Sequence, residues 1–139
     1  MIAHVPTAST LTDNVRSFLT ATPPRYATIA TINPDGNPHQ IVVWYLLRGD
    51  RIVVNSRHGR RWPSNLRRDG RANFAVYDGE DAVTIECVLE RTYEGDDAQA
   101  DIAEMARRYG SGEVPRFRAE RRISFVLRPT RVHVHGDAR

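Results

Sequence analysis

The sequence predicts a mainly β (α+β) domain, built as an antiparallel barrel with peripheral helices. Three observations predict it. Segments of strand composition outnumber helical segments, and short glycine-containing turns join several of them into hairpins. At 139 residues, the chain is long enough to bury one core. We therefore expect a single domain over residues 1–139.

The first half of the chain reads as one helix followed by hairpins. Residues 10–13 supply an N-cap for a short helix, which ends at Pro23-Pro24. Strands are expected at residues 25–32, 39–47 and 51–56. The run 41–47 is apolar at every position, so both of its faces should be covered. One face would fill the barrel, and a helix or a second subunit would cover the other.

The second half is expected to contain two further helices and three strands. Pro63 suits the first turn of a helix that ends near Asp69-Gly70. Cys87 lies in the inward register of an alternating strand, so we interpret it as a core residue. The remaining segments are strands at 72–77, 83–90 and 123–134, a helix at 96–109 and an irregular loop at 111–118. Pro129 interrupts the last strand, which indicates an edge or a bulge.

Positive charge is concentrated in one segment. Residues 57–71 contain six arginines and a single acidic residue, whereas the whole chain carries a net charge of +3 and has no lysine. A local basic cluster favours a small anionic ligand, while nucleic acid usually requires a broad basic face. We therefore expect no nucleic-acid partner.

The composition also bears on location. No apolar run approaches the length of a membrane helix, and residues 1–10 lack the pattern of a signal peptide. Cys87 is the single cysteine, which excludes an intrachain disulfide. These features predict a cytoplasmic protein without a membrane partner.

The segment 55–69 carries the candidate binding chemistry. A strand ends in Asn55 and Ser56, a glycine loop follows, and Arg60 and Arg61 precede a helix. Helix N-termini and guanidinium groups both bind phosphate. The alternative interpretation is a solvated arginine face. The candidate ligand-binding residues of this segment are Asn55, Ser56, Arg57, Arg60, Arg61, Trp62 and Asn65.

The sequence gives less support for ligand or metal binding by several other residues. His39 and Gln40 face either a ligand or the solvent at a strand end. Of Trp44 and Tyr45, on opposite faces of one strand, one is expected in the barrel and the other at a subunit interface or over the ligand. His133 and His135 share a strand face but lack a third ligand, so no metal site is predicted.

Residues 27–39, followed by Val43-Trp44-Tyr45, resemble the opening of the pyridoxamine 5′-phosphate oxidase-like superfamily. Residues 65–71 resemble its helix-to-strand signature. Residues 106–110 and 128–132 are similar to an actinobacterial branch that contains deazaflavin (coenzyme F-420)-dependent oxidoreductases. The resemblance covers residues 10–135. It implies an FMN-binding split barrel, a homodimer with each site built from both chains, and a cofactor that contacts His39, Gln40, Val43 and Trp44 besides the residues of segment 55–69.

The resemblance also implies an activity, the transfer of a hydride from reduced F-420 to an unsaturated small molecule. The alternatives are an FMN-dependent oxidoreductase or oxidase of the same fold, and a non-enzymatic carrier of flavin, deazaflavin or haem. Because the cofactor performs hydride chemistry, no catalytic residue is assigned. One departure concerns Trp62, where many relatives have a phosphate-binding lysine. Arg60 and Arg61 would then bind the phosphate in place of the lysine. Trp62 would either cover the ring or pack in the core.

Overall fold

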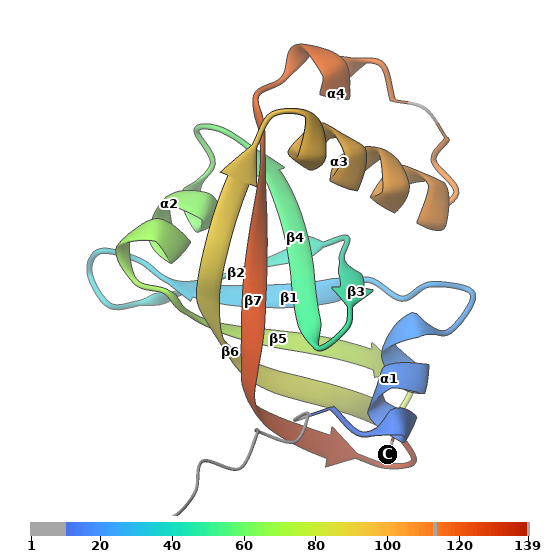
Figure 1. The fold of residues 1–139 in the computed structure, drawn as a ribbon. Helices are drawn as coiled ribbons and strands as arrows, with labels where there is room; N and C mark the ends of the chain where they lie inside the picture. Colours follow the sequence, from blue (N-terminus) through green and yellow to red (C-terminus); the bar gives the residue numbers. More distant parts are fainter. Residues whose placement is uncertain (1–10, 113, 139) are drawn as a thin grey trace, which may run out of the picture.

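The computed structural model describes residues 11–112 and 114–138, which contain four helices and seven strands (Figure 1). The helices are α1 (Asp13–Thr20), α2 (Arg61–Arg68), α3 (Asp96–Arg108) and α4 (Arg116–Ala119). The strands are β1 (Ala27–Ile32), β2 (Pro38–Val43), β3 (Leu46–Arg48), β4 (Arg51–Arg57), β5 (Arg71–Asp78), β6 (Asp81–Glu94) and β7 (Arg122–His135). All strand pairs are antiparallel, in the order β2-β1-β5-β6-β7-β4-β3. No helix within these residues is long and apolar enough to span a membrane.

The two longest strands, β6 and β7, divide the sheet into two halves. One end of β6 pairs with β5, and the opposite end of β7 pairs with β4. Between these ends, the β6–β7 register shifts at Glu86/Cys87 and at Leu89/Arg91, which bends the pair. In Figure 1, β4 and the adjoining parts of β6 and β7 run across the direction of β1, β2 and β5. The predicted split-barrel architecture is confirmed, with an open edge at β2 and at β3.

The main core lies between the two halves. It joins Ile29 of β1, Phe74 of β5 and Ile85 of β6 to Val54 of β4 and Phe125 of β7. Burying apolar side chains of this size is the main driving force for the fold. Helix α1 closes one end of this core with Val15 and Leu19.

A second apolar cluster packs on the outer face of β4 and β7. Val53 and Val126 point to this face and contact Ile102 and Met105 of α3 and Phe117 of α4. Because both faces of β4 are covered, Ile52, Val53 and Val54 are all buried. Helix α3 is thereby fixed above the end of β4, where the candidate ligand-binding segment begins.

The expected strand at 39–47 is wrong as one continuous element. It breaks at Trp44-Tyr45, because β2 belongs to one edge of the sheet and β3 to the other. Tyr45 crosses between them, is fully buried, and donates from its hydroxyl to the Leu19 carbonyl at 2.6 Å. Within this chain Val42 is 61% exposed, so no helix of the described residues covers that face of β2, and cover by a second subunit stays a prediction.

Several smaller predictions can be compared with the structure. Thr12 caps α1 through a hydrogen bond to its hydroxyl from the Val15 N–H, and β6 alternates as expected. Pro129 lies beside a bulge in β7, which is an interior strand of the sheet. Cys87 is a core residue, and burial raises the pKa of its thiol to about 12. The expected irregular loop at 111–118 is corrected in part, because it contains the start of α4.

Candidate functional site

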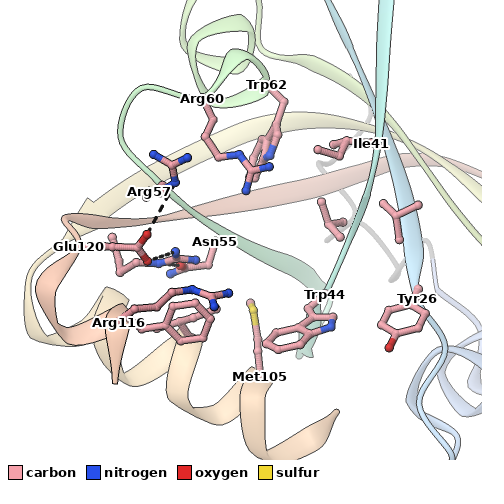
Figure 2. A pocket seen from close by; sticks show the side chains of 15 residues that line it. Tyr26, Ile41, Trp44, Asn55, Arg57, Arg60, Trp62, Met105, Arg116 and Glu120 are labelled. Carbon is pink, nitrogen blue, oxygen red and sulfur yellow. Dashed lines mark hydrogen bonds and ion pairs between the residues drawn. The ribbon is translucent and has the colours of Figure 1, made fainter. Parts of the chain in front are cut away.

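A cavity of about 300 Å³ lies where the ends of β2 and β4 meet α3, α4 and the start of β7 (Figure 2). Its lining divides by chemistry. Figure 2 shows Arg57, Arg60, Arg116 and Glu120 gathered on one side and Ile41, Trp44 and Tyr26 on the other. The division predicts a ligand with an anionic end and an apolar, flat end.

The charged side forms because the end of β4 lies beside the start of β7. Arg57 and Arg122 are direct partners across this antiparallel pair, so both guanidinium groups reach the same end of the sheet. Glu120 lies between them, with its Oε1 3.0 Å from Nη1 of Arg122 and its Oε2 3.7 Å from Nε of Arg57. Arg60 precedes α2, and Arg116 belongs to α4.

Arg122 is the most enclosed of these arginines, with a side chain 8% exposed. Its Nε donates to Oδ1 of Asn55 at 2.8 Å. Its guanidinium also lies over the Phe117 ring, 4.8 Å from the centroid. Burial lowers the pKa of Arg122 below its usual value, and the hydrogen bond to Glu120 opposes this change. A buried cation with such partners is held in one orientation.

A buried hydrogen-bond network supports Asn55 from behind. Its Nδ2 donates to Oγ of Ser124 and to the Ala98 carbonyl, each at 3.0 Å. Ser124 donates in turn to Oδ2 of Asp101 at 2.5 Å, and Tyr93 donates to the same oxygen. Burial, followed by the hydrogen bond to Asp101, raises the pKa of Tyr93. The amide of Asn55 therefore has a fixed orientation, with its oxygen directed at Arg122.

Three stacked aromatic rings flank the apolar side. Trp44 stacks on Tyr109 with ring centroids 5.3 Å apart and an interplanar angle of 6°. Tyr26 also stacks on Tyr109, at 5.4 Å and 11°. Arg108 lies over the rings of Tyr45 and Tyr109, and burial raises the pKa of Tyr109 to about 12. Tyr109 thereby holds the Trp44 indole at the edge of the cavity.

The structure brings together six of the eleven residues selected from the sequence. The cavity lining includes Val43, Trp44, Asn55, Arg57, Arg60 and Trp62. Trp62 is also a core residue, since it is 2% exposed and packs against Phe125 at a centroid distance of 5.2 Å. Packing in the core is thus one role of Trp62, beside its place in the cavity lining.

The other five selected residues are not among those that line this cavity. Gln40 faces a separate surface hollow beside Glu86 and His133, and His39 pairs with Thr31 in the β1–β2 hairpin. Ser56 is buried and donates to the Arg57 carbonyl. Asn65 is buried and donates from Nδ2 to Oγ1 of Thr31 and Oδ1 of Asn33. Arg61 is exposed at the start of α2.

The cavity also contains residues that the sequence did not single out as ligand contacts. They are Tyr26, Ile41, Val42, Ile102, Met105, Arg116, Phe117, Glu120 and Arg122. Ile102 and Met105 belonged to an expected helix face, but no local pattern placed that face against segment 55–60. The basic residues Arg68 and Arg71 lie elsewhere. Arg68 donates to Asn65 Oδ1 and to the Ile32 carbonyl, and Arg71 pairs with Asp69 at 2.8 Å, which lowers the pKa of Asp69 to about 2.

The histidine pair near the C-terminal end of β7 has a different environment. His133 Nε2 lies 3.1 Å from Oε2 of Glu86. Across the described ranges, no group of three or more histidine, cysteine, aspartate or glutamate side chains is placed to bind a metal ion.

Comparison with known proteins places the chain in a family. A sequence profile described as pyridoxamine 5′-phosphate oxidase matches residues 11–136, whereas no curated protein matches. Among solved structures, an F-420 reductase is similar with a TM-score of 0.75 and 23% identity, over 93% of this chain and 98% of that one.

Two other solved structures share the fold with lower TM-scores. A haem-binding protein from Mycobacterium smegmatis has a TM-score of 0.66 and 25% identity, over 94% of this chain and 55% of that one. An FMN-binding protein from Syntrophomonas wolfei has a TM-score of 0.66 and 15% identity, over 88% and 84%. Because the family profile spans nearly all of the described residues, the chain belongs to the pyridoxamine 5′-phosphate oxidase family.

Proposed function

We propose that this protein is an oxidoreductase that holds reduced coenzyme F-420 in the cavity and passes its hydride to an unsaturated small molecule. The division of the cavity into an arginine-rich side and an aromatic side carries the proposal. A deazaflavin has the same division, because its flat ring system is joined through a ribityl chain to a phosphate. Membership of the family and the F-420 reductase and FMN-binding neighbours support a flavin-type ligand.

The arginine side fits a phosphate. Arg57 at the end of β4, Arg60 before α2 and Arg122 at the start of β7 all line this side. One guanidinium group can donate two parallel hydrogen bonds to the oxygens of a phosphate. Arg122 is oriented by Asn55, so it needs little reordering when a ligand arrives. We assign the phosphate to these three residues.

The apolar side fits the ring. Val43 at the end of β2, Trp44 directly after it and Met105 of α3 offer apolar and aromatic contacts to a planar group. When bound, reduced F-420 supplies the hydride. The side chains of this region hold the ring in place and exclude water from it.

No side chain is assigned to proton transfer. Within the described part of the chain, neither a histidine nor a cysteine lines the cavity, and Glu120 is paired with arginines. The proposed reaction thus relies on the position of the cofactor and substrate.

The charge of the cavity favours F-420 over FMN. FMN ends in one phosphate, whereas F-420 continues from its phosphodiester into a chain of glutamate carboxylates. Arg60 and Arg116 are exposed beside the more enclosed Arg122 and offer further positive charge to such a chain. An FMN-dependent oxidoreductase or oxidase is the alternative, because one phosphate also satisfies Arg57 and Arg122.

We further propose that the protein acts as a homodimer whose second chain completes each site. Tyr26 and Val42 line the cavity, yet they are 59% and 61% exposed. Large exposed apolar groups beside a ligand site indicate a surface that a partner covers. A symmetric pair would bury this surface in both chains.

Titrating the purified protein with F-420 and with FMN tests the cofactor assignment. F-420 should bind more tightly, and its affinity should fall as salt rises from about 0.05 to 0.5 M, where the screening length shortens from roughly 14 to 4 Å. Arg116→Ala should flatten this salt dependence. Arg71→Ala is the matched control, because Arg71 pairs with Asp69 outside the cavity.

The other outcomes point to the alternatives. If FMN binds more tightly than F-420, or co-purifies at one per chain, the cofactor assignment changes from F-420 to FMN. Binding of reduced F-420 without turnover of any unsaturated compound would make the protein a carrier.

A further inference from the structure

Glu120 is the only acidic residue among the described residues that line the cavity, where it faces four arginines. It follows directly after α4, and its side chain is 24% exposed. Each carboxylate oxygen approaches a different arginine. Oε1 lies 3.0 Å from Nη1 of Arg122, and Oε2 lies 3.7 Å from Nε of Arg57. Figure 2 marks the contact between Glu120 and Arg57 with a dashed line.

The carboxylate occupies the position that an anionic ligand group requires. Arg57 and Arg122 are cross-strand partners, and Glu120 bridges their guanidinium groups from the cavity side. Arg122 is largely removed from solvent, and a buried charge is costly unless it is paired. In the absence of ligand, Glu120 supplies the negative charge that Arg122 needs.

We propose that Glu120 is an internal counter-ion, which the phosphate group of a ligand displaces from Arg57 and Arg122. This inference rests on the proposed function, because it takes the cavity to be the site of a phosphate-bearing cofactor. Displacement needs no movement of the backbone. Gln99 of α3 donates to the carbonyls of Phe117 and Glu120 at 2.9 Å each and so tethers the segment, while the Glu120 side chain turns about its own bonds.

The exchange determines which anions bind. When a ligand binds through a carboxylate, that group only takes the place of the Glu120 carboxylate, so the exchange contributes little to affinity. A phosphate offers more acceptor oxygens to the two forked guanidinium groups, so it gains from the exchange. The displaced carboxylate still repels the bound anion, which keeps the affinity for every anion below its possible value.

Binding of FMN and of riboflavin to wild type and to Glu120→Gln tests this role, because the two ligands differ only in the phosphate. Glu120→Gln should bind FMN on the order of 10-fold more tightly, while riboflavin affinity should stay within about 2-fold. Glu94→Gln is the matched control. It removes the same charge from a carboxylate that pairs with His58 and Arg121, at 2.9 Å each, neither of which lines the cavity.

The outcomes separate the inference from the proposed function. Unchanged or weaker FMN binding by Glu120→Gln overturns the counter-ion role and leaves the cavity as a phosphate site. An equal gain in FMN affinity with Glu94→Gln would show that the effect comes from net charge alone, and this result also overturns the counter-ion role of Glu120. If neither wild type nor Glu120→Gln binds F-420 or FMN, the proposed function fails, and the inference fails with it.

Discussion

Arg122 and Asn55 are joined by a hydrogen bond of 2.8 Å from Nε to Oδ1, and this contact connects the cavity to a buried carboxylate behind it. Asn55 donates to Ser124, and Ser124 donates to Asp101. Asp101 is 2% exposed and is not among the residues that line the cavity. The position of a ligand-facing arginine thus depends on a group within the packed interior of α3, β4 and β7.

Asp101→Ala should be strongly destabilising. The substitution removes the acceptor that Ser124 and Tyr93 share. It also removes the contact of 2.7 Å between Nη2 of Arg48 and Oδ1 of Asp101. Because Arg48 is 42% exposed, the main cost comes from the two lost hydrogen bonds to a buried charged group, about 1.5–3 kcal/mol each in the free energy of unfolding, measured by urea denaturation. Glu104→Ala is the control, because Glu104 also pairs with Arg48 but is 47% exposed, so its loss should cost below about 1 kcal/mol. Equal losses for the two variants would show that the network does not stabilise the fold.

Alkaline pH should destabilise the fold through Cys87. Burial raises the pKa of its thiol from 9.0 to about 12, so the folded state favours the protonated form. This stabilisation is fully present below pH 9 and is lost as the pH rises toward 12, at up to about 1.4 kcal/mol per pH unit. Cys87→Ala should make the stability curve between pH 9 and 12 less steep, measured by denaturation at each pH. Rapid alkylation of native Cys87 at pH 8 would be inconsistent with this environment.

The proposed dimer predicts an effect of charge at Val42. Val42→Asp places a carboxylate on an apolar surface that the partner would cover, which is unfavourable. Light scattering at micromolar concentration should give a dimer for wild type and a monomer for the variant, with unchanged circular dichroism. A wild-type mass near 15.8 kDa would refute the dimer.

Local patterns predicted most of the secondary structure. The alternation of residues 83–90, the glycine-containing turns and the N-cap of the first helix each depend on neighbours within a few residues. The break at Trp44-Tyr45 does not, because it arises from the separation of β2 and β3 to opposite edges of the sheet. An apolar run has the same composition whether it forms one strand or two.

Only the part of the candidate site that segment 55–60 forms could be predicted from local patterns in the sequence. Asn55, Arg57 and Arg60 are close in sequence and fall at the end of a strand, which is a local signal. Arg116 and Glu120 reach the same cavity from a segment about 60 residues away. Only the pairing of β4 with β7 and the packing of α3 bring that segment into place, and neither contact is visible in a local pattern.

The adjacent residues Arg60 and Arg61 provide the most direct test of the site. Both were selected from the sequence, but only Arg60 is among the residues that line the cavity. Arg60→Ala should weaken F-420 binding by roughly 10- to 150-fold, since it removes a charged hydrogen-bond donor from the ligand. Arg61→Ala should stay within about 3-fold of wild type, and both variants should melt like the wild type. Wild-type affinity in Arg60→Ala, or an equal loss in Arg61→Ala, would contradict the assignment of this cavity as the cofactor site.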